Sequence, residues 1–261
     1  MMGRNFRQMR QSNTPVALTI AGSDSGGEAG IQADLNTFAH LGVHGTTVIT
    51  CLTAQNARRI SRLEPCSPGM VRAQLEAVGA HFDVAAAKTG MLYSAGIVRE
   101  AALFMRRHSH IPLVVDPVMV STSGRRLLQC DGIEALKKLL LPLAAIATPN
   151  LAEAEILAGG KIRSLEQLRA AAGVIHRRFG CAALVKGGHL AGSAEAVDFF
   201  HGPEGEWMLS APREANATLH GTGCTYSAAI TAWLARGKSP VRAIALAKQY
   251  ITGRIKETQE K

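Results

Sequence analysis

The stretch HGTGC, at residues 220–224, combines residue types that could hold a phosphate group. Gly221 and Gly223 flank Thr222 and stand directly before an apolar run with helical spacing, which predicts a helix that begins here. Glycines let consecutive backbone N–H groups turn toward one point, and a helix N-terminus attracts anions through these amides and the helix dipole. A transferring phosphoryl group would be stabilised by the same arrangement. The alternative is a glycine-rich turn before a buried helix.

Cys224 would lie in the first turn of this helix. A thiol at a helix N-terminus is deprotonated more easily than an ordinary thiol. We therefore expect Cys224 to ionise readily and to act in catalysis beside the anion hole formed by Gly221, Thr222 and Gly223.

Phosphoryl transfer also needs a metal site and cations for the nucleotide phosphates. Asn150 and Glu153, in the motif PNLAE, are three residues apart where a predicted strand meets a helix, so they face one side of its first turn. Their oxygen donors suit Mg²⁺. Asp116, at the end of another strand, is a second candidate ligand, although it could simply cap its loop. Lys186 offers a cation for nucleotide phosphates, and the alternative is a solvated lysine.

These candidates follow apolar segments of the kind buried on both faces of a parallel sheet, of which residues 15–22 are the first. Strands and helices alternate as far as a hairpin predicted around residues 203–205. The pattern predicts one doubly wound, mostly parallel α/β domain at residues 15–261, flanked by helices and preceded by a flexible basic tail at residues 1–14. Ligands bind such a sheet at the carboxyl ends of its strands. Six polar clusters would share that edge: residues 22–24, 55–56, 88–90, 116–117, 148–150 and 186–189.

Composition excludes several other classes of protein. The 261 residues are 47% hydrophobic and 19% charged, which is typical of a globular protein, and no apolar stretch predicts a membrane span. The five scattered cysteines indicate neither disulfides nor zinc and favour a reducing cytoplasm. The net charge is +9 but only 5% of residues are aromatic, so we expect no nucleic-acid partner. Neither a dinucleotide fingerprint nor a P-loop occurs, and His189 and His220 show no metal spacing.

Several motifs together resemble the hydroxymethylpyrimidine/phosphomethylpyrimidine kinases of thiamine biosynthesis, which belong to the ribokinase-like superfamily. In chain order they are AGSDSGGEAGIQADL, TAQN, KTGML, DPVM, TPNLAEAE, VKGGH and HGTGCTYSAAI. The resemblance covers all but the N-terminal tail. HGTGC is its most specific motif, because most relatives carry aspartate at the position of Cys224.

The resemblance implies a cytoplasmic homodimer that uses ATP and Mg²⁺. It would phosphorylate 4-amino-5-hydroxymethyl-2-methylpyrimidine and then its monophosphate, with no membrane or nucleic-acid partner. By matching motif positions, the pyrimidine site would be lined by Gly22, Asp34, Gln55, Met91 and Cys224. The nucleotide and metal would be served by Asn150, Glu153 and Lys186, and the anion hole would be residues 221–223.

One position departs from the family pattern, and two rival functions remain open. Glu28 stands in the first loop where glycine is common. The nearest rival activity is that of a pyridoxal kinase, because pyridoxal also carries a hydroxymethyl group on a six-membered aza-aromatic ring. A non-catalytic pyrimidine-binding protein is the rival from another class.

Overall fold

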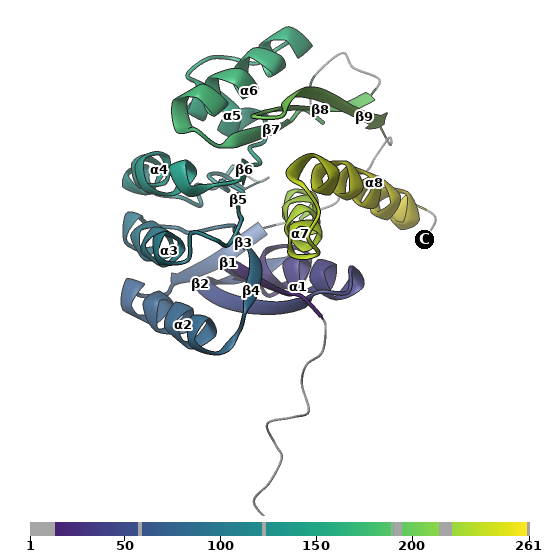
Figure 1. Cartoon of the computed structure of the whole chain (residues 1–261). Coiled ribbons are helices and arrows are strands. Elements are labelled where there is room, and N and C mark those ends of the chain that lie inside the picture. The colour runs from purple at the N-terminus through teal and green to yellow at the C-terminus, as the bar shows by residue number, and fades with distance from the viewer. Residues whose placement is uncertain are drawn as a thin grey trace, which may run out of the picture.

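The computed structural model describes residues 14–56, 59–121, 124–188, 190, 195–213 and 221–259. Within these ranges nine strands form one sheet, in the order β3-β2-β1-β4-β5-β6-β7-β8-β9 (Figure 1). Six strands run parallel: β1 (Val16–Asp24), β2 (His44–Asn56), β4 (Val84–Thr89), β5 (Leu113–Val115), β6 (Ile146–Ala147) and β7 (Ala182–Lys186). Three antiparallel strands extend the two edges: β3 (Arg59–Pro65), β8 (Glu195–Gly202) and β9 (Gly205–Pro212). The predicted mostly parallel α/β fold and the late hairpin are confirmed.

Helices cover both faces of the sheet (Figure 1). One face carries α2 (Pro68–His81), α3 (Ala95–Arg107), α4 (Cys130–Ala135), α5 (Leu151–Ala158) and α6 (Leu165–Phe179). A π-helical turn (Leu136–Leu140) and a 3₁₀ turn (Leu141–Leu143) continue α4. The other face carries α1 (Gly30–His40), α7 (Thr222–Ala235) and α8 (Pro240–Gln259). Among the described residues, no helix is both long and apolar enough to span a membrane.

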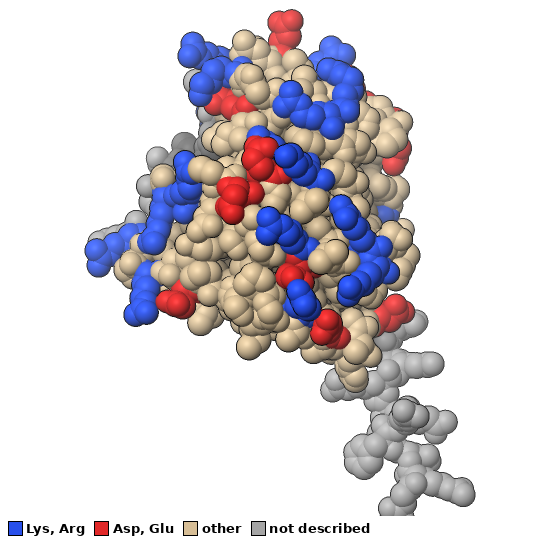
Figure 2. Space-filling model, turned by 90° about the vertical axis from the view of Figure 1, so that its left-hand side faces the viewer, with Lys and Arg blue, Asp and Glu red and all other residues tan. Residues whose placement is uncertain are grey.

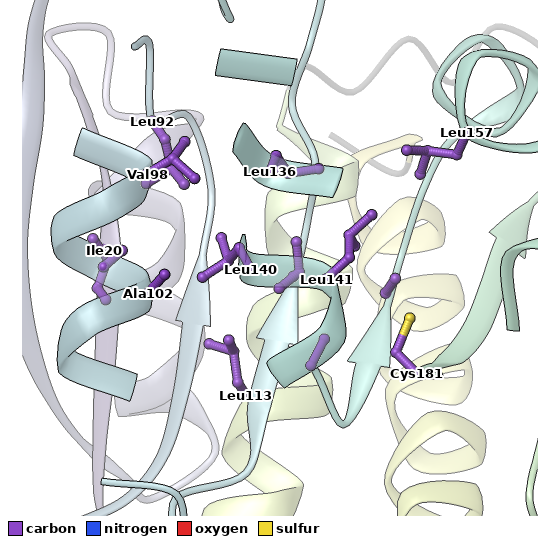
Figure 3. Packing of buried hydrophobic residues seen from close by; sticks show 14 of the residues in the cluster. Ile20, Leu92, Val98, Ala102, Leu113, Leu136, Leu140, Leu141, Leu157 and Cys181 are labelled. Atoms are coloured by element: carbon purple, nitrogen blue, oxygen red, sulfur yellow. The ribbon is translucent and has the colours of Figure 1, made fainter. Parts of the chain in front are cut away.

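The sheet separates two hydrophobic cores. In the larger one, Leu113 of β5 packs with Leu136, Leu140 and Leu141, none of which is exposed to solvent (Figure 3). Burial of each leucine contributes roughly 1.5–3 kcal/mol. The smaller core joins α1, α7 and α8 to the opposite face. Figure 2 shows that basic and acidic side chains are interspersed over the surface of the helices on the larger-core side.

The strand order reverses between β1 and β4. The chain runs from β1 outward to β2 and β3, and then returns to β4 on the other side of β1. Thr19 of β1 pairs with Lys88 of β4, so the loops that follow these two strands diverge at their carboxyl ends. A reversal of this kind opens a crevice at the strand ends, where ligands bind α/β sheets.

Candidate active site

The first turn of α7 is built where the HGTGC motif predicts it. Gly221 is the N-cap, with a left-handed φ of 79°, and the helix begins at Thr222. A Cβ at residue 221 would overlap the carbonyl oxygen of Glu28, so the position requires glycine for both backbone conformation and space. The first loop, residues 24–29, therefore packs directly against the anion hole. His189 and His220 lie outside the described residues.

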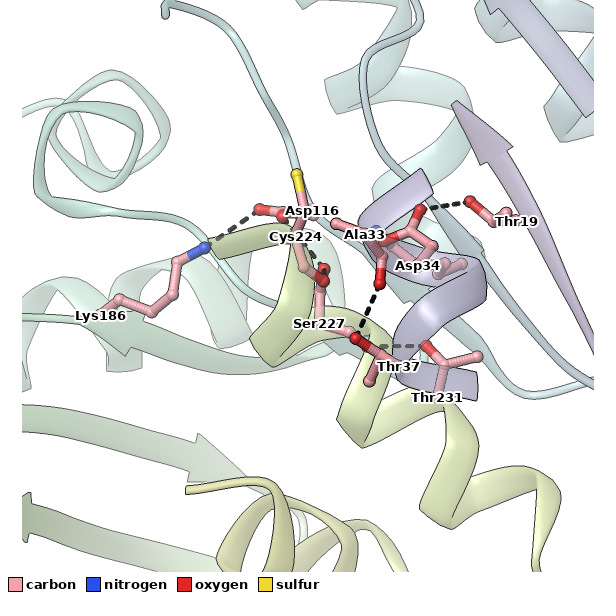
Figure 4. Close-up of polar contacts among 10 residues, drawn as sticks. Thr19, Ala33, Asp34, Thr37, Asp116, Lys186, Cys224, Ser227 and Thr231 are labelled. Carbon is pink, nitrogen blue, oxygen red and sulfur yellow. Dashed lines mark hydrogen bonds and ion pairs between the residues drawn. The ribbon is translucent and has the colours of Figure 1, made fainter. Parts of the chain in front are cut away.

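Lys186 reaches this helix from the end of β7. Its Nζ lies 3.1 Å from Asp116 Oδ1, and a Cβ added to Gly223 would lie 3.2 Å from the same nitrogen (Figure 4). Ser227 of α7 donates its hydroxyl to Asp116 Oδ2 at 3.1 Å. Burial by itself would lower the pKa of Lys186, but the charges of Asp116 and Glu153 raise it above its ordinary value. The ammonium is therefore charged at neutral pH, at the edge of the anion hole.

Asn150 and Glu153 form a capping box at the start of α5. Asn150 Oδ1 accepts the Glu153 amide at 3.0 Å, and Glu153 Oε2 accepts the Asn150 amide at 2.9 Å. The other Glu153 oxygen accepts the Met119 amide at 3.1 Å. This arrangement confirms that Asn150 and Glu153 face one side of the first turn. Burial, and after it the charge of Asp116, raises the pKa of the Glu153 carboxyl.

The residues around Asp116 and Glu153 fit Mg²⁺ better than a metal held by protein ligands alone. The described part of the chain holds no group of three or more His, Cys, Asp or Glu side chains placed to bind a metal. Mg²⁺ commonly takes only one or two carboxylates and completes its shell with water and phosphate oxygens. Two neighbouring carboxylates, one of which has a pKa raised partly by the other, would be stabilised by a divalent cation.

Cys224 does not ionise as easily as its position in the first turn of α7 predicts. Burial raises the pKa of the thiol to about 11, the charge of Lys88 opposes this rise, and Asp34 and Asp116 add to it. The Gly30 amide bonds to the sulfur and also favours the thiolate, but its effect is smaller. Desolvation and two carboxylates thus outweigh the helix N-terminus, and the expectation of a readily ionised thiol is wrong.

The expected place of Asp34 in the pyrimidine site stays a prediction, because its carboxylate is paired with Lys88 inside the protein. It has no exposed area; Lys88 Nζ lies 2.6 Å from Oδ1, and Thr19 donates to Oδ2 at 2.6 Å (Figure 4 labels Asp34 and Thr19). Asp34 therefore belongs to the buried layer under the site, where it holds the Lys88 ammonium. The sequence placed Lys88 only in a polar cluster at a strand end, although a lysine inside the apolar run VAAAKTG signals a buried partner.

Gly22 and Met91 lie together at the carboxyl ends of β1 and β4. A Cβ at Gly22 would contact the Met91 sulfur at 3.4 Å. Met91 forms a small apolar cluster with Cys51 and Leu127, against which four partly buried side chains pack: Ile60, Leu63, Tyr93 and Val118. We call these seven side chains the pyrimidine-side cluster, after the substrate site that Gly22 and Met91 are expected to line.

Gln55 stands at the end of β2, next to the first loop. The backbone N–H of Gln55 donates to Ser25 Oγ at 2.8 Å, and the Ser25 hydroxyl donates to the backbone carbonyl of Gln55 at 2.8 Å. Its half-buried side chain carries both a donor and an acceptor, which can pair with the edge of an aminopyrimidine.

Asp24 organises the first loop, a role that sequence reasoning missed. Its buried carboxylate accepts the amides of Gly26 and Ala29, each at 2.8 Å, and of Glu28 at 3.2 Å. An aspartate followed by Ser-Gly-Gly is a turn signal that could have identified it. Because this loop carries the exposed Glu28 against Gly221, Asp24 determines the shape of one wall of the anion hole.

The sheet order, the glycine-rich start of α7 and the Lys186–Asp116 pair agree with a phosphotransferase of ribokinase-like fold, the class to which the solved structures similar to this chain belong. The chain belongs to the phosphomethylpyrimidine kinase family, whose sequence model matches residues 24–261. A hydroxymethylpyrimidine/phosphomethylpyrimidine kinase of Rhizobium meliloti (strain 1021) is 48% identical over 243 residues, which are 93% of this chain and 91% of that protein.

Two solved structures show how far the similarity extends in three dimensions. The phosphomethylpyrimidine kinase from Clostridium difficile 630 is 40% identical, with a TM-score of 0.82 over 93% of this chain and 100% of that chain. The pyridoxal kinase from Staphylococcus aureus in complex with AMP-PCP and pyridoxal is 35% identical, with a TM-score of 0.84 over 93% of this chain and 88% of that chain. The family implied by the sequence motifs is thereby confirmed.

Proposed function

We propose that this kinase transfers a phosphoryl group from ATP to the hydroxymethyl group of 4-amino-5-hydroxymethyl-2-methylpyrimidine, and then phosphorylates the monophosphate to the diphosphate. One observation carries the proposal: the glycine-rich first turn of α7 lies against the charged Lys186 side chain, an arrangement that suits a transferring phosphoryl group. Lys186 Nζ is placed against Gly223, and the pyrimidine-side cluster gathers around Met91. The role in thiamine biosynthesis, the cytoplasmic location and the homodimer follow from the family resemblance.

Each group at the site has a defined task in this reaction. The amides of residues 222–224 would face the transferring phosphoryl group, and Lys186 would neutralise its charge. Asp116 and Glu153 would hold Mg²⁺, which when bound neutralises the nucleotide phosphates. Gln55 and Met91 would orient the pyrimidine, so that the acceptor oxygen points toward α7.

Cys224 would serve the two steps differently. The acceptor of the first step is a neutral alcohol, which benefits from a base. The acceptor of the second step is a phosphate monoester that is already ionised near pH 7, because its second pKa is about 6. With a pKa of about 11, the Cys224 thiol is uncharged at neutral pH and does not repel that phosphate.

The substrate assignment is tested by measuring ATP-dependent ADP release with hydroxymethylpyrimidine, its monophosphate, pyridoxal and ribose. Both pyrimidines should be phosphorylated. A rate on ribose or pyridoxal that exceeds the rates on both pyrimidines would sink the assignment.

Pyridoxal kinase activity is the second candidate. The Staphylococcus aureus pyridoxal kinase, whose structure holds AMP-PCP and pyridoxal, covers 93% of this chain. Pyridoxal also presents a hydroxymethyl group on a six-membered aza-aromatic ring, and the pyrimidine-side cluster is apolar enough to accept it. We expect lower activity on pyridoxal, because Gln55 offers its paired donor and acceptor to the aminopyrimidine edge.

A further inference from the structure

The loop that joins β5 to α4 connects the two sides of the site. It starts at Asp116, which pairs with Lys186, and its Met119 amide is held by Glu153 of the capping box. Farther along, Leu127 belongs to the pyrimidine-side cluster. Two contacts close the loop on itself: an antiparallel bridge between Val120 and Arg126, and a bond from the Leu127 amide to the Met119 carbonyl at 2.9 Å.

Two residues at this place have backbones that their side chains disfavour. Val118 has a φ of 38° and Tyr93 a φ of 66°, the two positive values among the described residues other than glycine. A β-branched residue at positive φ is strained, and strain of this kind persists where the surrounding contacts hold the segment firmly. Both side chains pack on the pyrimidine-side cluster. The described parts of the loop, on either side of residues 122–123, therefore pack on the pyrimidine-side cluster through Val118 and Leu127.

Arg125 extends from this loop to β3, the edge strand that covers the cluster. Its Nη1 donates to the Ile60 carbonyl at 2.8 Å, across 65 positions of sequence. Ile60 is the strand partner of Gln55, next to an irregularity in the pairing of β2 with β3. Burial raises the pKa of the Cys51 thiol to about 11, and the charge of Arg125 is near enough to oppose that rise. The guanidinium thus lies at the rim of the cluster.

We propose that Arg125 is a positioning residue for the pyrimidine substrate: its bond to the Ile60 carbonyl pins β3 over the pyrimidine-side cluster and holds Gln55 in place. The inference rests on the proposed function, because it takes Gln55 and the cluster as the pyrimidine site. Arg125 acts through Ile60 and Gln55, and it touches neither the Lys186–Asp116 pair nor Glu153. Its removal should therefore weaken pyrimidine binding and leave nucleotide binding unchanged.

The matched control is the neighbouring Arg126, an exposed arginine whose guanidinium contacts the Cys130 sulfur and makes no bond to β3 among the described residues. Arg125→Ala and Arg126→Ala remove the same charge one residue apart. Arg125→Lys keeps a cationic donor near the Ile60 carbonyl. We expect the dissociation constant for hydroxymethylpyrimidine, measured by calorimetry without nucleotide, to rise roughly tenfold in Arg125→Ala, the scale of a lost charged hydrogen bond. Arg125→Lys should recover part of this loss, and Arg126→Ala should bind like the unaltered protein.

Two further measurements distinguish loss of the Arg125–Ile60 hydrogen bond from other effects of the substitutions. The KM for ATP should stay within about twofold in all three variants. Equal losses in Arg125→Ala and Arg126→Ala, or a parallel loss of ATP affinity, would overturn the proposal. Hydrogen exchange of the β3 amides without ligand should be faster in Arg125→Ala than in Arg126→Ala. Equal exchange rates would show that Arg125 does not hold β3 in place, whatever the substrate is. Failure of the unaltered protein to bind the pyrimidine would instead contradict the proposed function.

Discussion

Lys186 Nζ and Asp116 Oδ1 lie 3.1 Å apart although 70 positions of sequence separate them. The pair joins the end of β7 to the end of β5, and Ser227 ties it to α7. A buried ion pair stabilises a fold only weakly, because desolvation offsets most of the attraction between the charges. Because Lys186 Nζ lies against Gly223, this pair agrees with the proposed roles of Lys186 at the transferring phosphoryl group and of Asp116 at Mg²⁺.

Glu153→Gln should reduce Mg²⁺-dependent turnover far more than pyrimidine affinity. The amide retains the shape of the carboxylate but removes its charge, and one of the two side-chain oxygens that accept backbone amides is replaced by an NH₂ donor. Titration of the rate with Mg²⁺ and calorimetry with the pyrimidine alone measure the two effects. If pyrimidine affinity falls in parallel with turnover, Glu153 is structural.

The rate on the alcohol should rise with pH relative to the rate on the monophosphate. The Cys224 pKa is raised from 9.0 to about 11, so the thiol is protonated at pH 7 and its thiolate fraction grows about tenfold per pH unit up to pH 9. Only the alcohol step gains from a base. Steady-state rates between pH 7 and 9 check this. A rate ratio that depends on pH in the same way in Cys224→Ala would assign the ionisation to another group.

Cys224→Asp should retain some alcohol phosphorylation and selectively lose the second step. A fixed carboxylate ~4 Å from the monophosphate, at an effective dielectric of about 20, repels it by roughly 4 kcal/mol, which lowers the rate by several hundred-fold or more. Cys224→Ala should damage the alcohol step more than the monophosphate step. The two activities are compared at one pH, and an unchanged ratio in both variants is the contrary result.

Asp34→Ala should lower the free energy of unfolding by about 3–5 kcal/mol, because it leaves the buried Lys88 ammonium without its partner. Asp34→Ala combined with Lys88→Met should recover part of this loss, since both charges are then removed. Denaturant unfolding of the three proteins measures the effect. Unaltered stability together with weaker pyrimidine binding would instead show that Asp34 serves the substrate pocket.

The sequence by itself determined the features that depend on short spacings. Alternation of apolar runs with helical segments predicted the layered fold, because periodicity decides which face of an element is buried. The placement of Asn150 and Glu153 on one side of the first turn of α5, and the start of α7, follow from residues a few positions apart, because helix geometry sets which side chains are neighbours. The family motifs located the remaining candidates at the strand ends.

Only the tertiary structure decided how these residues are solvated and which distant groups they meet. β3 escaped prediction because this edge strand is mostly exposed, with only Ile60 and Leu63 partly buried, so its sequence carries no apolar alternation. The ionisation of Cys224 and the burial of Asp34 depend on desolvation and on charges from other elements. The contacts of Glu28 with Gly221 and of Arg125 with Ile60 join segments far apart in sequence. Local spacing carries no information about such contacts, because they arise only when the elements pack together.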